Sequence, residues 1–304
     1  MSKRFFNSNV CLHLYQNTQN GFLLFYSTQD FLVFFTLFCT MARKYRIRVL
    51  GLCLMIDHIH ALVQADSGKV LSSFVRHYAS LFTKEMKRWG NAASFRHPFG
   101  WAPKSSEKAL RTAMAYLYNN PVEKALVLRA EDYRWNFLSY ARSDHPFSEP
   151  LVVRKSSYRM KKALQQVDGL FARGTYLNPL ILRNLFKKLL PAEKRQLADH
   201  IVSRWSVIDY RTGLALYKSY EDMLSAFASN TGSEHEIRET RDSFSHRTYY
   251  KMNRIVREEL HLENTRDVLS LDLDEKLAVA RMLLSKSNAS IQQICRFLHI
   301  NRKM

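Results

Sequence analysis

The order of hydrophobic and polar positions in the first half of the chain predicts a sheet flanked by helices. Residues 10–15 alternate as a strand does, with Val10, Leu12 and Leu14 on one face. Residues 28–40 have the continuous apolar character of a buried helix. Residues 46–55 and 58–64 predict two strands of a hairpin, and Ile56-Asp57 forms the turn between them.

Two further helices are predicted before residue 125. Apolar side chains recur at helical spacing from Leu71 to Met86, and basic side chains occupy the opposite face. A second helix runs from about 106 to 119 and ends there, because Pro121 disfavours helical geometry in the residue before it. Residues 91–104 predict an irregular loop. The pattern is that of a small α+β domain with an antiparallel sheet and flanking helices.

Helical periodicity alone continues after about residue 149. It predicts a domain of residues 1–149 followed by an all-helical accessory domain, residues 150–304. Thr231-Gly232-Ser233 predicts a turn within that second domain. Residues 290–301 resemble the first helix and turn of a helix-turn-helix, although a terminal bundle helix is the interpretation we favour. The expected helices span residues 164–173, 179–190, 192–205, 219–229, 245–260, 274–285 and 290–298.

The charge of the chain points to a polyanionic partner. There are 46 Lys and Arg against 27 Asp and Glu, a formal net charge of +19. Residues 1–149 hold 19 basic and 10 acidic side chains, and residues 150–304 hold 27 and 17. Because both halves share the excess, we expect an extended nucleic-acid footprint; a generally basic surface is the alternative.

Other classes of protein are disfavoured. The four cysteines are scattered without a CxxC pair, so neither a zinc ribbon nor a disulfide framework is expected. The apolar run at residues 31–39 is shorter than the roughly 20 residues that a membrane span needs. We therefore expect a protein of the reducing cytoplasm, associated with the nucleoid if its partner is DNA, and no membrane contact.

His58 and His60 are candidate metal ligands. They lie two residues apart on a predicted strand, so both side chains leave the same face, with Cα atoms ~6.6 Å apart. Two imidazoles in this arrangement are able to share one metal ion. The alternative is an ordinary pair of sheet residues.

Tyr116 and Asn120 lie four residues apart at the end of a predicted helix, and therefore on one face. A phenol beside an amide oxygen offers a nucleophile and a third metal ligand. The alternative is a core aromatic side chain near a helix end. Tyr118 falls on a different face and is a poorer candidate.

Three stretches in this order resemble a known family. They are Met55-Ile56-Asp57-His58-Ile59-His60, the stretch Tyr116-Leu-Tyr-Asn-Asn-Pro-Val-Glu-Lys-Ala125, and Glu131-Asp-Tyr-Arg-Trp135 with Ser139-Tyr140. They are similar to the "Met-Pro-Asn-His-x-His", "Tyr-Ile-x-x-Asn-Pro-Val-x-Ala" and "Asp-Tyr-x-Trp-Ser-Ser" segments of the REP-associated tyrosine transposases, a branch of the single-tyrosine HUH transposases. The resemblance covers about residues 10–140, and His13 lies where the family often has a histidine.

The resemblance implies a ferredoxin- or RRM-like HUH domain that cuts and rejoins single-stranded DNA through a covalent phosphotyrosine. His58, His60 and Asn120 would hold a divalent metal, magnesium or manganese, and Tyr116 would be the nucleophile. The DNA would lie next to a hairpin or palindromic repeat, and Trp89, Phe99 and Trp101 are candidates for stacking on unpaired bases. A homodimer is left open.

The chain departs from the family pattern in two places. Ile56-Asp57 replaces Pro-Asn before the first histidine, and Glu123-Lys124-Ala125-Leu126 holds one extra residue. Neither departure removes a proposed ligand. Two alternatives to the enzyme remain: a catalytically silent, domesticated DNA-binding protein that acts on hairpin repeats, and an RNA-binding module.

Overall fold

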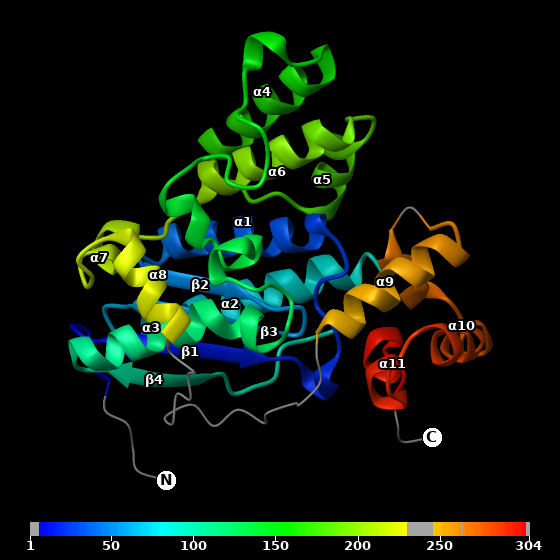
Figure 1. The fold of residues 1–304 in the computed structure, drawn as a ribbon, viewed down its shortest axis with the longest axis horizontal. Coiled ribbons are helices and arrows are strands. Elements are labelled where there is room, and N and C mark those ends of the chain that lie inside the picture. Colours follow the sequence, from blue (N-terminus) through cyan, green and yellow to red (C-terminus); the bar gives the residue numbers. More distant parts are fainter. Residues whose placement is uncertain (1–5, 230–245, 263, 302–304) are drawn as a thin grey trace.

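A computed structural model describes residues 6–229, 246–262 and 264–301. The first half forms a sheet with three long helices (Figure 1). Its elements are β1 (Cys11–Asn17), α1 (Thr28–Lys44), β2 (Arg48–Leu54), β3 (His58–Gln64), α2 (Gly68–Lys87), β4 (Gly100–Lys104) and α3 (Glu107–Glu123).

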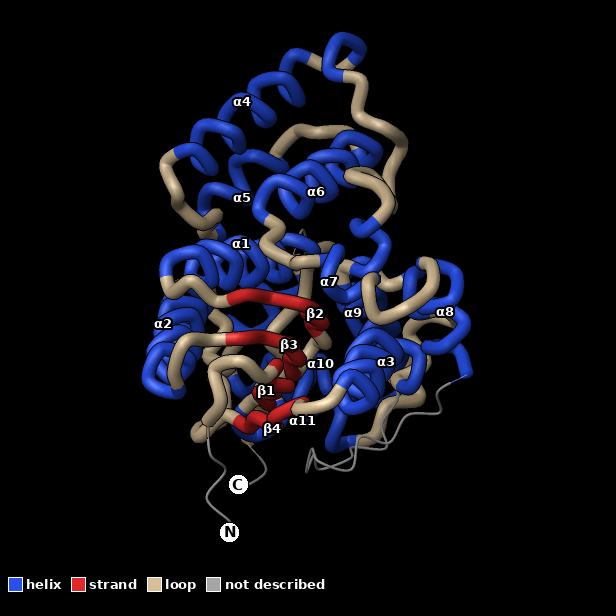
Figure 2. The backbone as a smooth tube through the Cα atoms, turned by 90° about the vertical axis from the view of Figure 1, so that its left-hand side faces the viewer, coloured by secondary structure: helices blue, strands red, loops and turns tan. Residues whose placement is uncertain are grey.

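The four strands are ordered β2-β3-β1-β4, and every neighbouring pair is antiparallel. This order is the ferredoxin-like arrangement, in which each of two helical crossovers skips one strand. Helices α1 and α2 cover one face of the sheet, and α3 covers the other (Figure 2). The predicted α+β fold with an antiparallel sheet and flanking helices is confirmed.

Strand β4 was missed by the sequence pattern. Residues 91–104 were expected to be irregular, but Gly100–Lys104 pairs with β1 at the edge of the sheet. Pro103 is tolerated there because an edge strand has one side that needs no backbone donor. Gly100 is required by space, because a Cβ at this position would lie 2.0 Å from the ring of Tyr15.

The predicted end of the helix before Pro121 is wrong. Helix α3 continues through Pro121 to Glu123. A proline inside a helix costs about 3 kcal/mol. The polar contacts of buried Asn120 with His58 and His60 hold the chain in the helix against this cost. Asn119 is also anchored, because its Nδ2 donates to the backbone oxygen of Phe227 at 2.5 Å. The helix ends at Glu123, Lys124 is its C-cap, and Ala125 after the cap adopts a left-handed φ of 55°.

The second half is helical throughout the described residues, as expected. Short α7 was not predicted, and the turn expected at residues 231–233 lies outside the described residues. The helices are α4 (Tyr158–Ala172), α5 (Pro179–Phe186), α6 (Pro191–Trp205), α7 (Tyr210–Leu214), α8 (Tyr220–Ser229), α9 (Arg247–Glu259), α10 (Leu273–Lys286) and α11 (Ile291–Leu298).

Six of these helices form two groups against the first half, while α7 contacts β2 and α8 contacts α3. Helices α4 to α6 lie over α1, and α9 to α11 form a separate lobe (Figure 1). Helix α11 packs on the first half, since the hydroxyl of Tyr26 donates to the backbone oxygen of Phe297 at 2.5 Å.

Buried side chains form one hydrophobic cluster on both sides of residue 149. The division into domains 1–149 and 150–304 stays a prediction. None of the described helices combines the length and apolar character needed to cross a bilayer.

A buried ion pair joins the two halves. Asp30 caps the start of α1 together with Ser27, and its carboxylate contacts Arg266 of the 3-10 helix η6 (Thr265–Ser270). Asp30 is fully buried and Arg266 is 4% exposed. Removing one member of such a pair leaves an uncompensated charge in the interior.

We predict that Arg266→Met lowers the free energy of unfolding by about 3–5 kcal/mol, because it strands the carboxylate of Asp30. Urea denaturation followed by circular dichroism measures the change. Asp267→Asn alters the exposed neighbouring residue and is the control, with an expected change within about 0.5 kcal/mol. Equal stability of Arg266→Met and wild type would contradict the prediction.

Candidate metal and tyrosine site

Strand β3 directs His58 and His60 to the face of the sheet that α3 covers. Side chains two residues apart on a strand share a face, and the two imidazole centres are 5.1 Å apart. Both rings are buried, with exposed fractions of 8% for His58 and 0% for His60. The predicted common orientation of the two rings is therefore present.

Asn120 meets both histidines from α3. Its Oδ1 lies 3.3 Å from Nε2 of His58. Its Nδ2 lies 3.2 Å from Nε2 of His60 and donates to it. The structure thus brings together the three residues that the sequence suggested as metal ligands, and all three are buried.

The opposite nitrogen of each ring has its own partner. Nδ1 of His58 donates to Oδ1 of Asp57 at 2.6 Å. Since Nε2 of His60 accepts from Asn120, Nδ1 of His60 carries the proton and donates to Nε2 of His13 at 3.1 Å. Contacts of this kind hold the tautomer and the ring angle of metal-binding histidines. They direct both Nε2 lone pairs towards the amide of Asn120.

The donor set fits a cation. With the proton of Nδ1 directed to Asp57, His58 turns Nε2 towards the amide oxygen of Asn120. Two acceptors at 3.3 Å repel each other unless a proton or a metal ion lies between them. Two imidazole nitrogens and an amide oxygen are ordinary ligands of divalent metals.

Tyr116 lies one helical turn before Asn120 and packs against the histidines. Its ring centre is 5.4 Å from that of His60 and 5.8 Å from that of His13. It is 9% exposed. Tyr118 faces elsewhere, as predicted, and stacks on Phe227 with ring centres 5.4 Å apart.

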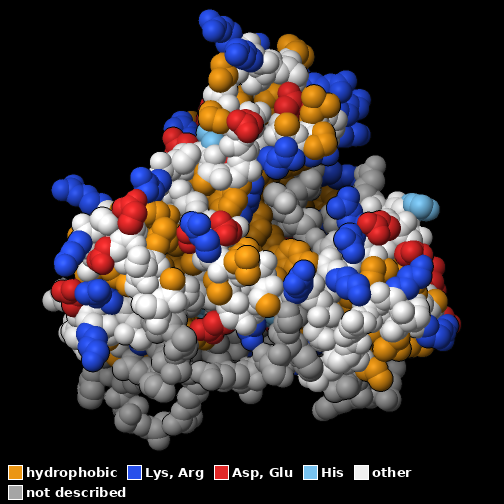
Figure 3. Space-filling model, in the orientation of Figure 1, with side chains coloured by type: hydrophobic (Ala, Val, Ile, Leu, Met, Phe, Trp, Pro, Cys, Tyr) orange, Lys and Arg blue, Asp and Glu red, His pale blue; other side chains and the backbone are white. Residues whose placement is uncertain are grey.

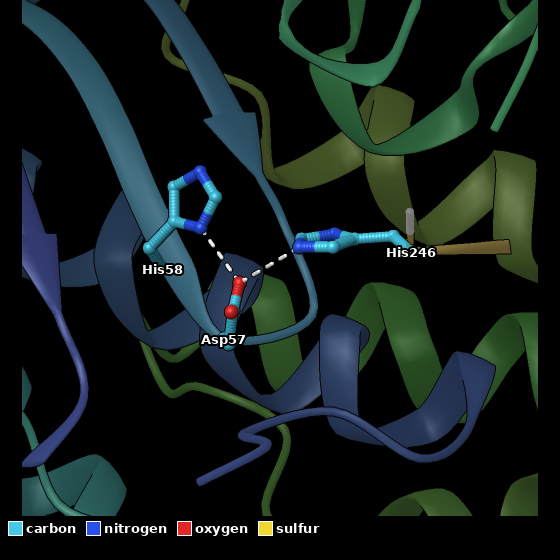
Figure 4. A group of neighbouring side chains, drawn as sticks. All are labelled: Asp57, His58 and His246. Carbon is cyan, nitrogen blue, oxygen red and sulfur yellow. Dashed lines mark hydrogen bonds and ion pairs between the residues drawn. The ribbon is translucent and has the colours of Figure 1, made fainter. Parts of the chain in front are cut away.

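His246 is a member of the site that no sequence motif indicated. It precedes α9, and its Nε2 lies 3.5 Å from Oδ1 of Asp57 (Figure 4). It is 2% exposed, and its Nδ1 has no hydrogen-bond partner among the residues that the structure describes. One ligand atom each from Asp57, His58 and His246 lies within 4.8 Å of the other two, so these residues form a second candidate metal-binding group. Only the folded chain brings residue 246 to this hairpin.

The electrostatics of the site keep the carboxylate of Asp57 charged and favour the neutral forms of His60 and His246. Burial alone would raise the pKa of Asp57, but the neighbouring His246 and His58 outweigh it and hold this pKa well below its usual range. Burial, together with His58 and His13, holds the pKa of His60 well below 6.5. Burial also lowers the pKa of His246 to about 4, against the opposing effect of Asp57. Neutral imidazoles are the form that binds metals.

The three aromatic residues suggested for base stacking are half-buried. The guanidinium groups of Arg183 and Arg266 lie 5.8 and 5.6 Å from the ring centre of Trp89. Trp101 contacts Phe6 edge-on at 6.3 Å. The stacking role of Trp89, Phe99 and Trp101 stays a prediction.

Comparison with known proteins bears on this site. Residues 25–108 match the family model described as "Transposase IS200 like". This segment contains His58 and His60 and ends before Tyr116. A solved structure described as a REP-associated tyrosine transposase bound to a REP hairpin is 18% identical, with a TM-score of 0.39; the match covers 44% of this chain and 80% of that one. Curated protein sequences gave no significant match. The resemblance predicted from the motifs is therefore confirmed: over residues 25–108 this chain is similar to the IS200-like transposases.

Proposed function

We propose that the chain is a transposase that cuts and rejoins single-stranded DNA through Tyr116. The observation that carries this proposal is the convergence of His58 Nε2 and His60 Nε2 on Asn120, one helical turn from Tyr116. The family match over residues 25–108 supports the class of reaction.

The reaction balances as two phosphoryl transfers. The oxygen of Tyr116 attacks the scissile phosphate; the new phosphorus–oxygen bond to tyrosine forms while the bond to the leaving sugar oxygen breaks, and the phenolic proton passes to solvent or to that oxygen. A hydroxyl of a second DNA end then attacks the phosphotyrosine; the new phosphorus–oxygen bond to that hydroxyl forms while the bond to tyrosine breaks, and the hydroxyl proton passes to solvent or to the phenolic oxygen of Tyr116. The covalent link preserves the energy of the broken bond, so rejoining needs no ATP.

His58, His60 and Asn120 would hold the divalent metal. When bound, such an ion polarises the phosphate and stabilises the charge that builds on it, which compensates for the weak nucleophilicity of a neutral tyrosine with a pKa of about 10. We favour magnesium or manganese because phosphate oxygens and water suit hard ions, although the histidines would also suit zinc, iron or nickel. Asp57 and His13 would orient the two histidines, and His246 would orient Asp57.

The proposed substrate is single-stranded DNA next to a hairpin or palindromic repeat. A net charge of +19 favours a polyanion, and the motif resemblance favours DNA hairpins. The second half would act as an accessory domain for this DNA. A homodimer stays a prediction, as does a place at the nucleoid.

We predict that Tyr116→Phe abolishes the covalent protein–DNA adduct formed with Mn²⁺ and labelled single-stranded hairpin DNA, because the nucleophilic oxygen is gone. Denaturing gel electrophoresis detects the adduct. Tyr118→Phe removes a hydroxyl two residues along the same helix and is the matched control, with the adduct expected to remain. An undiminished adduct from Tyr116→Phe would reject the nucleophile. DNA binding without any wild-type adduct would instead favour the non-catalytic DNA-binding protein.

We predict that Asp57→Asn weakens Mn²⁺ binding by about 10- to 100-fold, because His58 loses the carboxylate that orients it. Isothermal titration calorimetry without DNA gives the affinity. Asp66→Asn removes an exposed carboxylate beyond the other end of β3 and is expected to leave the affinity unchanged. A loss of the same size in both variants would mean that the overall charge of the protein, and not the contact of Asp57 with His58, determines the affinity for Mn²⁺.

The two candidate donor sets make opposite predictions. If Asn120 is a ligand and His246 only orients Asp57, Asn120→Ala weakens Mn²⁺ binding more than His246→Ala does. The same titration compares the two variants, and unfolding curves show whether each retains its fold. The reverse order of affinities would assign the ion to Asp57, His58 and His246.

A further inference from the structure

A cleft of about 870 Å³ opens between the α4–α6 group and the α9–α11 lobe. Its volume lies within the range of pockets that bind organic ligands, roughly 300–1,000 Å³. Figure 3 shows it as a hollow with a hydrophobic floor and basic side chains around it. The floor comes from the first half, with Phe31, Ile56 and Trp135, and the walls come mainly from α6 and α9.

The charge that lines the cleft is strongly positive. Five basic side chains line it, against the single carboxylate of Glu258. Arg134 is paired with Asp199 at 2.9 Å and Arg254 lies 4.0 Å from Glu258. The other three are exposed, and no described carboxylate pairs with them; they are Lys194, Arg195 and Arg257. Cations without partners around a cleft attract an anionic ligand.

Aromatic and polar groups add a second type of contact. Tyr250 lines the cleft with 42% of its surface exposed, so its ring is available to stack. Trp135 lies deeper, stacked on Phe31 with ring centres 4.4 Å apart. The hydroxyl of Tyr249 is buried and, among the described residues, has no hydrogen-bond partner. Phosphate-binding cations beside an accessible aromatic ring are typical of surfaces that bind single-stranded nucleic acid.

The cleft also borders the candidate site. Ile56 lines it and is the residue before Asp57. Tyr249 lines it and lies one helical turn after His246. The β2–β3 turn and the start of α9 therefore separate the cleft from the Asp57–His58–His246 group, and a strand held in the cleft would lie beside that group.

We propose that this cleft binds a segment of single-stranded DNA adjacent to the one cut by Tyr116. Lys194, Arg195 and Arg257 contact its phosphates, and Tyr250 stacks on an unpaired base. The proposal rests on the proposed function for the identity of the nucleic acid. The cleft lies mostly outside residues 25–108, the part that resembles transposases, so the second half would supply a DNA contact of its own.

The test compares two double variants of the full chain with equal loss of charge. Arg195→Gln/Arg257→Gln removes two of the three cations of the cleft that have no described carboxylate partner, and Lys155→Gln/Lys162→Gln removes two exposed cations of the same half that lie outside it. Fluorescence anisotropy with a labelled mixed-sequence single-stranded oligonucleotide gives the affinity at roughly 50 to 200 mM salt. Each phosphate contact on a single strand contributes about 0.7 to the slope of log affinity against log salt.

We predict that the cleft variant binds more weakly and loses about 1.4 from that slope, while the control variant keeps both. Tyr250→Ala is expected to weaken binding roughly tenfold or more, without changing the slope. Equal losses in the cleft and control variants, or no loss in either, would overturn the proposal. Competition by duplex DNA or RNA as strong as by single-stranded DNA would also overturn it.

A readout of cleavage separates this proposal from the proposed function. At saturating hairpin DNA the cleft variant should still form the Tyr116 adduct, because Arg195 and Arg257 line the cleft and are not among the residues proposed to hold the metal or to attack the phosphate. An adduct that persists in Tyr116→Phe would reject the proposed function and leave the binding result intact. Unaltered binding by the cleft variant would reject the cleft and leave the adduct result intact.

Discussion

A continuous series of polar contacts inside the core constrains the rest of this structure. It runs from His13 through His60, Asn120 and His58 to Asp57 and His246, and every member is buried or nearly so. Buried polar groups cost free energy unless each finds its partner. Only one relative arrangement satisfies all of these contacts, because a displacement of any contributing element leaves a polar atom without its partner. The contributing elements are the two central strands, the hairpin turn, α3 and α9.

This constraint fixes both the register of β3 and the length of α3 around the site. A slip of one residue in β3 would turn His58 and His60 to the opposite face, which α1 and α2 cover with apolar side chains. A helix that ended before Pro121, as the sequence suggested, would release Asn120 from the face that carries Tyr116. Continuation of α3 through the proline is thus what keeps the nucleophile candidate and the amide one turn apart.

The sequence pattern was sufficient to predict elements whose structure depends on interactions between residues close together in the sequence. The strand expected at residues 58–64 is β3, and the start of α1 follows from Ser27 and Asp30, which form a capping box. The sequence pattern failed for features that depend on a residue far away in the sequence. The short edge strand β4 exists because β1 pairs with it, and Pro121 stays helical because buried neighbours on other elements anchor it. His246 lies in no motif, and only the packing of α9 against the β2–β3 turn brings it to Asp57.

The second half is bound to the site by the same kinds of interaction that hold the sheet together. His246 contacts Asp57, Asn119 donates to Phe227, and Arg266 neutralises the carboxylate at the start of α1. Each contact joins a residue of the first half to one that lies beyond residue 149. A change in the position of α9 would alter both the partner of Asp57 and the wall of the basic cleft, because His246 and Tyr250 lie within a little more than one turn of each other. The wall of the proposed DNA cleft and the histidine partner of Asp57 therefore come from the same segment of the chain.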